Sequence, residues 1–173
     1  MYNTYDSFVN TQLSVQADMK DIHIYDIATR TWYTQQATAF NDTFPPGRIE
    51  GCAVVASAPD LSSHNIYIYG GRPNDQNGGL GEVWILTLPT FYWVRTRSGA
   101  DKAITSQSCT KVRGTYMLVY RGTTDLGNSH CNNAGVRLMD LTTLEWISEV
   151  SPGDGGGEGY RVPEMVYSLI GGR

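Results

Sequence analysis

Short runs of hydrophobic residues, separated by polar turns, follow one another along most of the chain. The clearest occupy 66–69 (IYIY) and 83–88 (VWILTL), where β-branched and aromatic residues favour strands. Gly70 and Gly71 end the first run, and Pro89 ends the second because proline cannot donate a ladder hydrogen bond. Large apolar side chains occupy both faces of these strands. Such strands need cover on both sides, which one isolated sheet cannot supply.

Similar runs occur before and after this pair. The pattern predicts further strands at 22–27, 31–35, 51–58, 92–94, 108–112, 115–122, 136–141 and 144–150. Residues 1–20 are weakly patterned, and 36–48 are expected to form a loop because Pro45 and Pro46 exclude regular pairing there. No long run has apolar residues at helical spacing. The chain is therefore expected to be all-β.

The strands recur with a fixed period. Three segments end in a tryptophan six residues after a turn-forming position: Asp26 to Trp32, Thr87 to Trp93 and Asp140 to Trp146. Glycine-terminated strands end at Gly71, Gly122 and Gly172, in steps of 51 and 50 residues. A period of about 50 residues with about four strands per period is typical of the blades of a β-propeller. In that fold each blade is covered by its two neighbours.

At these residues the chain resembles the kelch repeat, in which a Gly-Gly pair ends the second strand and a tryptophan follows the third. The phrases IHIYDIATRTWYTQ and CAVVASAPDLSSHNIYIYGG look like the kelch-type propellers of filamentous fungi. The resemblance covers about 21–173 and implies a propeller near the galactose-oxidase central domain. Members of this fungal group commonly begin with a signal peptide and end with a membrane helix, and this sequence shows the pattern of neither.

The resemblance divides the chain into a weakly patterned segment (1–20) and an incomplete propeller (21–173). The propeller part would hold an outer half-blade at 21–36, full blades at 50–96 and 106–150, and the start of a further blade at 161–173, which Gly171 and Gly172 would close. Propellers typically close with about four to eight blades. The open blade faces would thus need missing blades or self-association to cover them, and a truncated chain is expected.

The repeat also assigns roles to its aromatic residues. Trp32, Trp93 and Trp146 are expected to pack between blades, because each stands at the same place in its repeat, and ligand stacking is the less favoured role. Trp84 does not recur in the other repeats. The middle repeat carries Arg121 where a glycine is expected, so that strand end can adopt only conformations that an arginine tolerates.

Composition and charge narrow the partners. The chain has 173 residues, 17% of them charged, and a net charge of −4. It has no basic stripe for nucleic acid. No apolar run approaches the ~20 residues of a membrane span, and the first residues lack the pattern of a signal peptide. The compartment stays open, since the resembled group is commonly extracellular and membrane-anchored.

Three cysteines, Cys52, Cys109 and Cys131, lack the close spacing of a zinc site. The fungal group often carries cysteines at the places of Cys109 and Cys131, which implies a Cys109–Cys131 disulfide in an oxidising compartment. Two buried thiols are the equally weighted alternative. Cys52 is expected to be a small core residue.

Few other residues suggest chemistry. Asn41 begins an N-glycosylation triplet (Asn41-Asp42-Thr43), and Arg48 is expected to bridge to a nearby carbonyl or carboxylate. The histidines (His23, His64, His130) have no metal-ligand spacing. No catalytic residue and no cofactor are therefore assigned.

The expected function is a non-catalytic interaction module that binds a protein or carbohydrate partner through inter-strand loops, with 72–81 and 123–134 as the candidate loops. Two alternatives stay open. One is a fragment of a galactose-oxidase-like copper oxidoreductase, and the other is a truncated gene product with no independent function.

Overall fold

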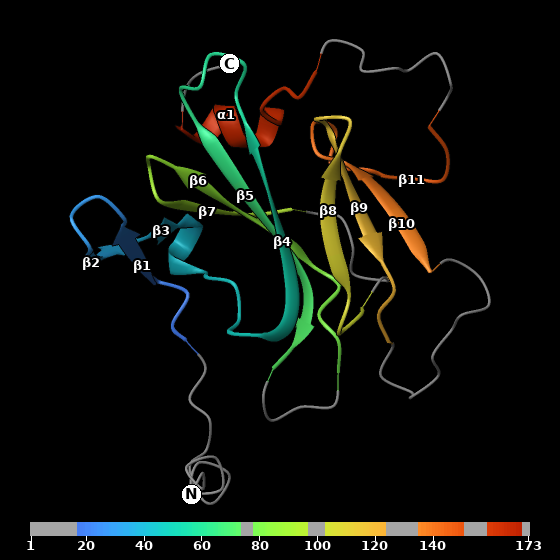
Figure 1. Ribbon diagram of the computed structural model, residues 1–173, viewed down its shortest axis with the longest axis horizontal. Helices are drawn as coiled ribbons and strands as arrows, with labels where there is room; N and C mark the ends of the chain where they lie inside the picture. The colour runs from blue at the N-terminus through green and yellow to red at the C-terminus, as the bar shows by residue number, and fades with distance from the viewer. Residues whose placement is uncertain (1–16, 74–77, 97–102, 124–134, 151–158, 171–173) are drawn as a thin grey trace, which may run out of the picture.

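The computed structural model describes residues 17–73, 78–96, 103–123, 135–150 and 159–170. In these residues the chain folds into three β-sheets, followed by one α-helix near the C-terminus (Figure 1). The strands are β1 (Asp21–Asp26), β2 (Thr31–Gln36), β3 (Thr38–Ala39), β4 (Ile49–Ser57), β5 (His64–Arg72), β6 (Val83–Leu88), β7 (Tyr92–Arg95), β8 (Ser108–Val112), β9 (Tyr116–Tyr120), β10 (Val136–Asp140) and β11 (Trp146–Ile147). A 3₁₀ turn, η1 (Phe40–Asp42), follows β3, and the helix is α1 (Glu164–Ile170).

The first sheet is the antiparallel pair β1–β2. The two strands are joined tightly because the Asp26 carboxylate accepts hydrogen bonds from the backbone N–H groups of Ala28 at 2.8 Å and Thr29 at 3.3 Å. These bonds pair backbone donors that the turn would otherwise leave free. The Thr29 side chain, and after it these backbone N–H groups, lower the pKa of Asp26 by hydrogen bonding to the carboxylate. The hairpin places Tyr25 directly opposite Trp32.

The second sheet has five strands in the order β3-β7-β6-β5-β4. Strands β4 to β7 run up and down as antiparallel neighbours, whereas β3 is added in parallel beside β7. The Thr38 N–H donates to the Phe91 carbonyl at 2.8 Å at that junction. The prediction of a loop over 36–48 was wrong for Thr38 and Ala39, because the outer edge of β7 offers backbone partners that the sequence pattern does not reveal.

The third sheet has the order β11-β10-β9-β8 and is antiparallel throughout. It packs face to face on the second sheet (Figure 1). Residues that alternate along the strands of each sheet form the core between them, and all are buried: Val54, Tyr67, Tyr69, Val83, Ile85 and Val94 from the second sheet, and Met117, Val119 and Met139 from the third. Burying one such side chain contributes roughly 1.5–3 kcal/mol.

The opposite face of the second sheet carries Trp84, Leu86 and Trp93. These side chains pack against Ile22 of β1, against Ala37, and against Ala39 and Phe44 in the segment that connects β2 to β4. The strands with apolar side chains on both faces were expected to need cover on both sides. The second sheet has this cover, because the third sheet packs on one face and the first sheet on the other.

The C-terminal part differs from the expectation of a new blade at 161–173. Residues Glu164–Ile170 form α1, not a strand. The Pro163 carbonyl accepts from the N–H groups of Val166 at 2.9 Å and Tyr167 at 3.1 Å, and Val166 is buried in the core. A helix satisfies its backbone groups internally, whereas a strand here would need a free sheet edge beside it.

The architecture is thus all-β, with one short helix among the described residues and sheets stacked side by side. It is compatible with a kelch-type β-propeller.

Candidate functional site

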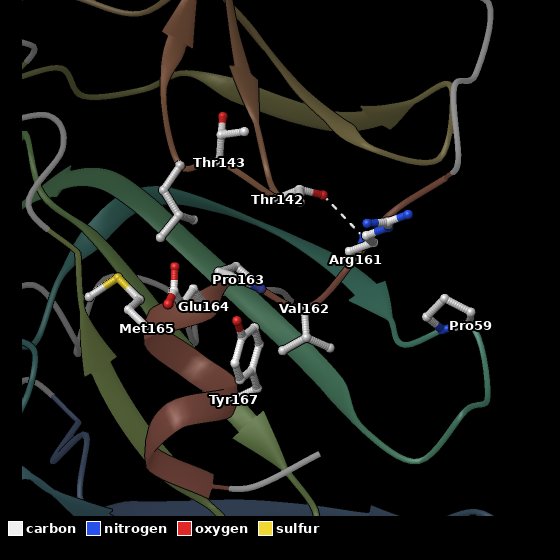
Figure 2. A pocket seen from close by; sticks show the side chains of 10 residues that line it. Pro59, Thr142, Thr143, Arg161, Val162, Pro163, Glu164, Met165 and Tyr167 are labelled. Carbon is white, nitrogen blue, oxygen red and sulfur yellow. Dashed lines mark hydrogen bonds between the residues drawn. The ribbon is translucent and has the colours of Figure 1, made fainter. Parts of the chain in front are cut away.

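A groove opens beside α1, at the ends of the second and third sheets (Figure 2). Its volume is about 1020 Å³. One side is the turn between β10 and β11, and the other is the segment that leads into α1 and its first turns. The lining residues are Pro59, Thr142, Thr143, Leu144, Arg161, Val162, Pro163, Glu164, Met165 and Tyr167.

Hydrogen bonds fix the β10–β11 side of the groove. The Asp140 carboxylate accepts from the N–H groups of Thr142 at 2.7 Å and Thr143 at 3.1 Å, just as Asp26 does in the first sheet. The backbone N–H of Arg161 donates to the Thr142 hydroxyl at 3.1 Å, which ties the two sides together (Figure 2). The groove is therefore a built feature of the fold, with its sides held by sequence-distant segments.

A buried polar cluster includes Leu141 and Tyr160, which directly precede the groove residues Thr142 and Arg161. The Tyr67 hydroxyl donates to the Leu141 carbonyl at 2.8 Å and lies 2.9 Å from the Tyr160 hydroxyl, which also accepts from the Asn65 amide at 2.9 Å. Burial raises the pKa of Tyr67 well above its ordinary value of 10.0, and it also raises the pKa of Tyr160. Both phenols stay protonated at neutral pH, so the cluster acts as a fixed hydrogen-bonded support for the groove.

The groove wall combines an apolar bed with a polar rim. Leu144, Val162 and Met165 supply apolar surface. Arg161 and Glu164 are exposed and bring charges of opposite sign, and Thr143 adds an exposed hydroxyl. Such a surface can bind a segment with apolar and charged groups, since apolar contact supplies affinity and the polar groups supply orientation.

A second, smaller hollow of about 390 Å³ lies on the other flank of α1. It is formed between Met165 and Leu169 of the helix and the β7 residues Tyr92 to Arg95. The helix therefore stands between two hollows, and Met165 lines both of them.

The three in-register tryptophans have different surroundings. Trp93 is buried and donates its indole N–H to the Met19 carbonyl at 2.8 Å. Trp146 is half-buried against Tyr69, with ring centroids 4.9 Å apart. Trp32, by contrast, is 68% exposed and stacks only on Tyr25, 5.0 Å away. The role of inter-blade packing stays a prediction for Trp32.

The glycines of the repeat stand where side chains do not fit. Gly70 and Gly71 have φ of 65° and 85°, and a Cβ on Gly70 would lie 2.8 Å from the Ile104 carbonyl oxygen and collide with the Gln107 side chain. Arg121 and Gly122 repeat these left-handed conformations, with φ of 58° and 116°. The arginine thus takes up the conformation of the glycine it replaces. Gly171 and Gly172 lie outside the described residues.

The structure corrects the disulfide. Cys109 of β8 is bonded to Cys52 of β4, with Cα atoms 5.6 Å apart, and not to Cys131, which lies outside the described residues. The reason is the stacking of the sheets: Cys52 and Cys109 both point into the interface between the second and third sheets. Cys52 is therefore one half of an inter-sheet link rather than a plain core residue.

Arg48 fulfils its predicted role, because its guanidinium donates to the Gly70 carbonyl at 3.0 Å. Asn41 is exposed in η1, and its glycosylation stays a prediction. His23 lies 3.1 Å from the Thr34 hydroxyl in the first sheet, whereas His64 lies 2.7 Å from the Ser57 hydroxyl in the second. His130 lies outside the described residues. Within the described part of the chain, no three His, Cys, Asp or Glu side chains come together.

The loops predicted to bind partners are described only at their ends, since 74–77 and 124–134 are outside the described residues. The groove itself was missed from the sequence. Its lining from Arg161 to Tyr167 falls in the segment that was expected to begin a further blade, whereas Glu164–Ile170 form a helix. The one available signal was Pro163 directly before Glu164, a combination that favours a helix start.

Comparison with known proteins agrees with the resemblance found in the repeat. A kelch repeat-containing protein of the fungus Arthroderma benhamiae is 30% identical over 178 aligned positions, which cover 89% of this chain. The chain is homologous to a fungal kelch-repeat protein. It spans about a quarter (26%) of that relative's length. No protein-family model matches the chain.

This similarity agrees with the period, the glycine-terminated strands and the tryptophans in register. In the part of the chain that the structure describes, no helix combines the length and the apolar character needed to cross a membrane.

Proposed function

We propose that the chain is a non-catalytic interaction module of the kelch type that binds a protein partner at the groove beside α1. The inter-strand turns β4–β5 and β10–β11 contribute to this groove, in keeping with a module that binds through its loops. The observation that carries the proposal is the lining: half of it is apolar, from Pro59, Leu144, Val162, Pro163 and Met165.

The charges on the rim favour a polypeptide over a sugar. Figure 2 shows Thr142 and Thr143 on one side of the groove, with Glu164 and Met165 across from them. Arg161 adds a positive charge and Glu164 a negative charge to this lining. A peptide with aliphatic and charged side chains can match both the bed and the rim, whereas a carbohydrate would leave most of the apolar bed uncovered.

Selection from a displayed library of random short peptides, in parallel with a glycan array, tests the proposal. The purified chain is the bait, and the variants Thr143→Arg and Glu164→Arg change exposed groove residues. Gln35→Arg, on the exposed first sheet and on the face of β2 opposite to Trp32, is the matched control. We expect selected peptides to bind the chain and the control equally and to lose at least about tenfold in affinity on either groove variant.

Peptides that bind the groove variants as tightly as the unchanged chain would contradict the proposed site. A glycan that binds, with the same sensitivity to Thr143→Arg and Glu164→Arg, would replace the protein partner by a carbohydrate.

A further inference from the structure

The second and third sheets pack on each other with defined faces. The tryptophan-bearing face of the third sheet (Met139 opposite Trp146) packs on the face of the second sheet that carries Tyr67 and Tyr69. At its centre the rings of Tyr69 and Trp146 are tilted by 56° with centroids 4.9 Å apart. Arg137 donates to the Tyr69 hydroxyl at 3.2 Å beside them.

The same arrangement holds on the other side of the second sheet. There Leu86 lies opposite Trp93, and this tryptophan-bearing face is turned toward the first sheet, where Trp93 reaches the Met19 carbonyl. Each tryptophan-bearing face is therefore covered by the segment that precedes it in the chain.

Two faces have no such cover in the described chain. The tryptophan-bearing face of the first sheet presents Tyr25, 44% exposed, and Trp32, 68% exposed. At the other end, the outer face of the third sheet presents Tyr120, 47% exposed, and Val136, 50% exposed. Leu118 and Leu138, which are directly opposite each other, continue that face. Exposed apolar surface of this kind, on both ends of one molecule, marks interaction sites.

The repeat makes these two faces complementary. Tyr120 precedes Arg121-Gly122 just as Tyr69 precedes Gly70-Gly71, so Tyr120 stands in the place of Tyr69. Trp32 stands in the place of Trp146, and Tyr25 in the place of Met139. The two halves of the Tyr69–Trp146 contact are thus present again, but at opposite ends of the chain.

We propose that copies of the chain associate head to tail, with the Tyr120 face of one copy covering the Trp32 face of the next. Tyr120 and Trp32 would then pack as Tyr69 and Trp146 do within each copy. His23, which stands in the place of Arg137, would lie next to the Tyr120 hydroxyl. None of the residues of these two faces lines the groove, so this inference is independent of the proposed function.

Such an interface is heterologous, so it leads to a ring or an open chain of copies and not to a closed two-fold dimer. The first sheet has two strands where the third has four. The contact between copies is therefore smaller than the internal one, and we expect reversible, concentration-dependent association.

Light scattering after size-exclusion chromatography tests the proposal over a range of protein concentrations. The unchanged chain, with a monomer mass of 19.1 kDa, is expected to rise in mean mass with concentration. Trp32→Lys and Tyr120→Lys each remove one of the two faces and are expected to stay monomeric. Tyr33→Lys, on the opposite face of β2 and 51% exposed, is the matched control and should associate like the unchanged chain.

Mixing the two monomeric variants gives the sharpest result. The Trp32→Lys copy keeps an intact Tyr120 face and the Tyr120→Lys copy keeps an intact Trp32 face, so an equal mixture should form a heterodimer and stop there. Circular dichroism of each variant shows whether it is folded. A monomeric unchanged chain at every concentration would overturn the proposal and leave the faces to another partner. Association of the unchanged chain without a heterodimer in the mixture would overturn the head-to-tail arrangement.

Discussion

Tyr69 in β5 and Trp146 in β11 lie against each other across the interface of the second and third sheets, with ring centroids 4.9 Å apart. They are 77 positions apart in the sequence. The pair joins the glycine-terminated strand of one repeat to the tryptophan of the next. Successive repeats of the sequence therefore form successive sheets that pack on each other.

Equivalent tryptophans should therefore differ in their effect on stability. Trp146→Ala removes a half-buried ring from a packed interface and should lower the free energy of unfolding by about 2–4 kcal/mol. Trp32→Ala changes a ring that is 68% exposed and should stay within about 0.5 kcal/mol in dilute solution. Urea denaturation measures both. Equal losses would show that Trp32 is covered in the monomer.

The disulfide between Cys52 and Cys109 should be a major source of stability. It closes a loop with a sequence separation of 57 residues, and the chain-entropy estimate for such a loop is about 4 kcal/mol. Replacing both cysteines by alanine should lower the free energy of unfolding by up to that amount. Peptide mapping of the unreduced protein gives an independent check: a peptide that joins Cys109 to Cys131 would contradict the pairing.

Gly70 should tolerate no side chain. Gly70→Ala forces a left-handed residue at φ 65° and places its Cβ against Gln107 and the Ile104 carbonyl oxygen, so we expect a loss of about 2 kcal/mol or more. Gly114→Ala is the matched control, because Gly114 has φ 74° and a Cβ added there would meet no atom within 4 Å. The control should lose about 1 kcal/mol from backbone conformation alone. Equal losses in thermal denaturation would contradict the close approach at Gly70.

The buried tyrosine pair should make stability fall at alkaline pH. The pKa of Tyr67 is raised in the folded state by desolvation first and by Tyr160 next. As the pH passes the ordinary value of 10.0, the unfolded chain loses this proton while the folded chain keeps it. The folded state then binds more protons, so the free energy of unfolding decreases as the pH rises.

Tyr67→Phe should flatten this decrease, in denaturation curves recorded on both sides of pH 10. An unchanged slope in the variant would show that other groups cause the decrease. Below that pH the variant should be less stable than the unchanged chain, since it lacks the hydrogen bond to the Leu141 carbonyl.

The strands and their period could be predicted from the sequence because alternation, glycine pairs and tryptophans are local signals. IYIY, VWILTL and the turn before Trp93 lie where the pattern placed them. Three features could not be predicted in the same way. The partner of Cys109 depends on which sheet faces which, and the addition of Thr38–Ala39 depends on a free edge of β7. The helix α1 forms in a segment whose local pattern, YSLI, favours a strand.

The groove was missed for the same reason. Its sides come from turns and a helix approach that are distant in sequence, and the Arg161–Thr142 hydrogen bond that joins them has no signature in either segment. Trp32 lies opposite Tyr25 just as Trp146 lies opposite Met139, so its position within the repeat could be read from the sequence. Its exposure depends on neighbouring sheets, which the sequence of a single repeat does not specify.

Hydroxyl-radical footprinting of the four tryptophans tests the central claim most directly, because it reports the cover of each repeat face in one experiment. In dilute solution, Trp32 should be oxidised much faster than Trp93 and Trp84, which are buried, with Trp146 between them. At high concentration Trp32 should become protected while the others stay unchanged. A Trp32 that is protected in dilute solution, or one that stays equally reactive at every concentration, would contradict an open repeat face that takes up the matching face of another copy.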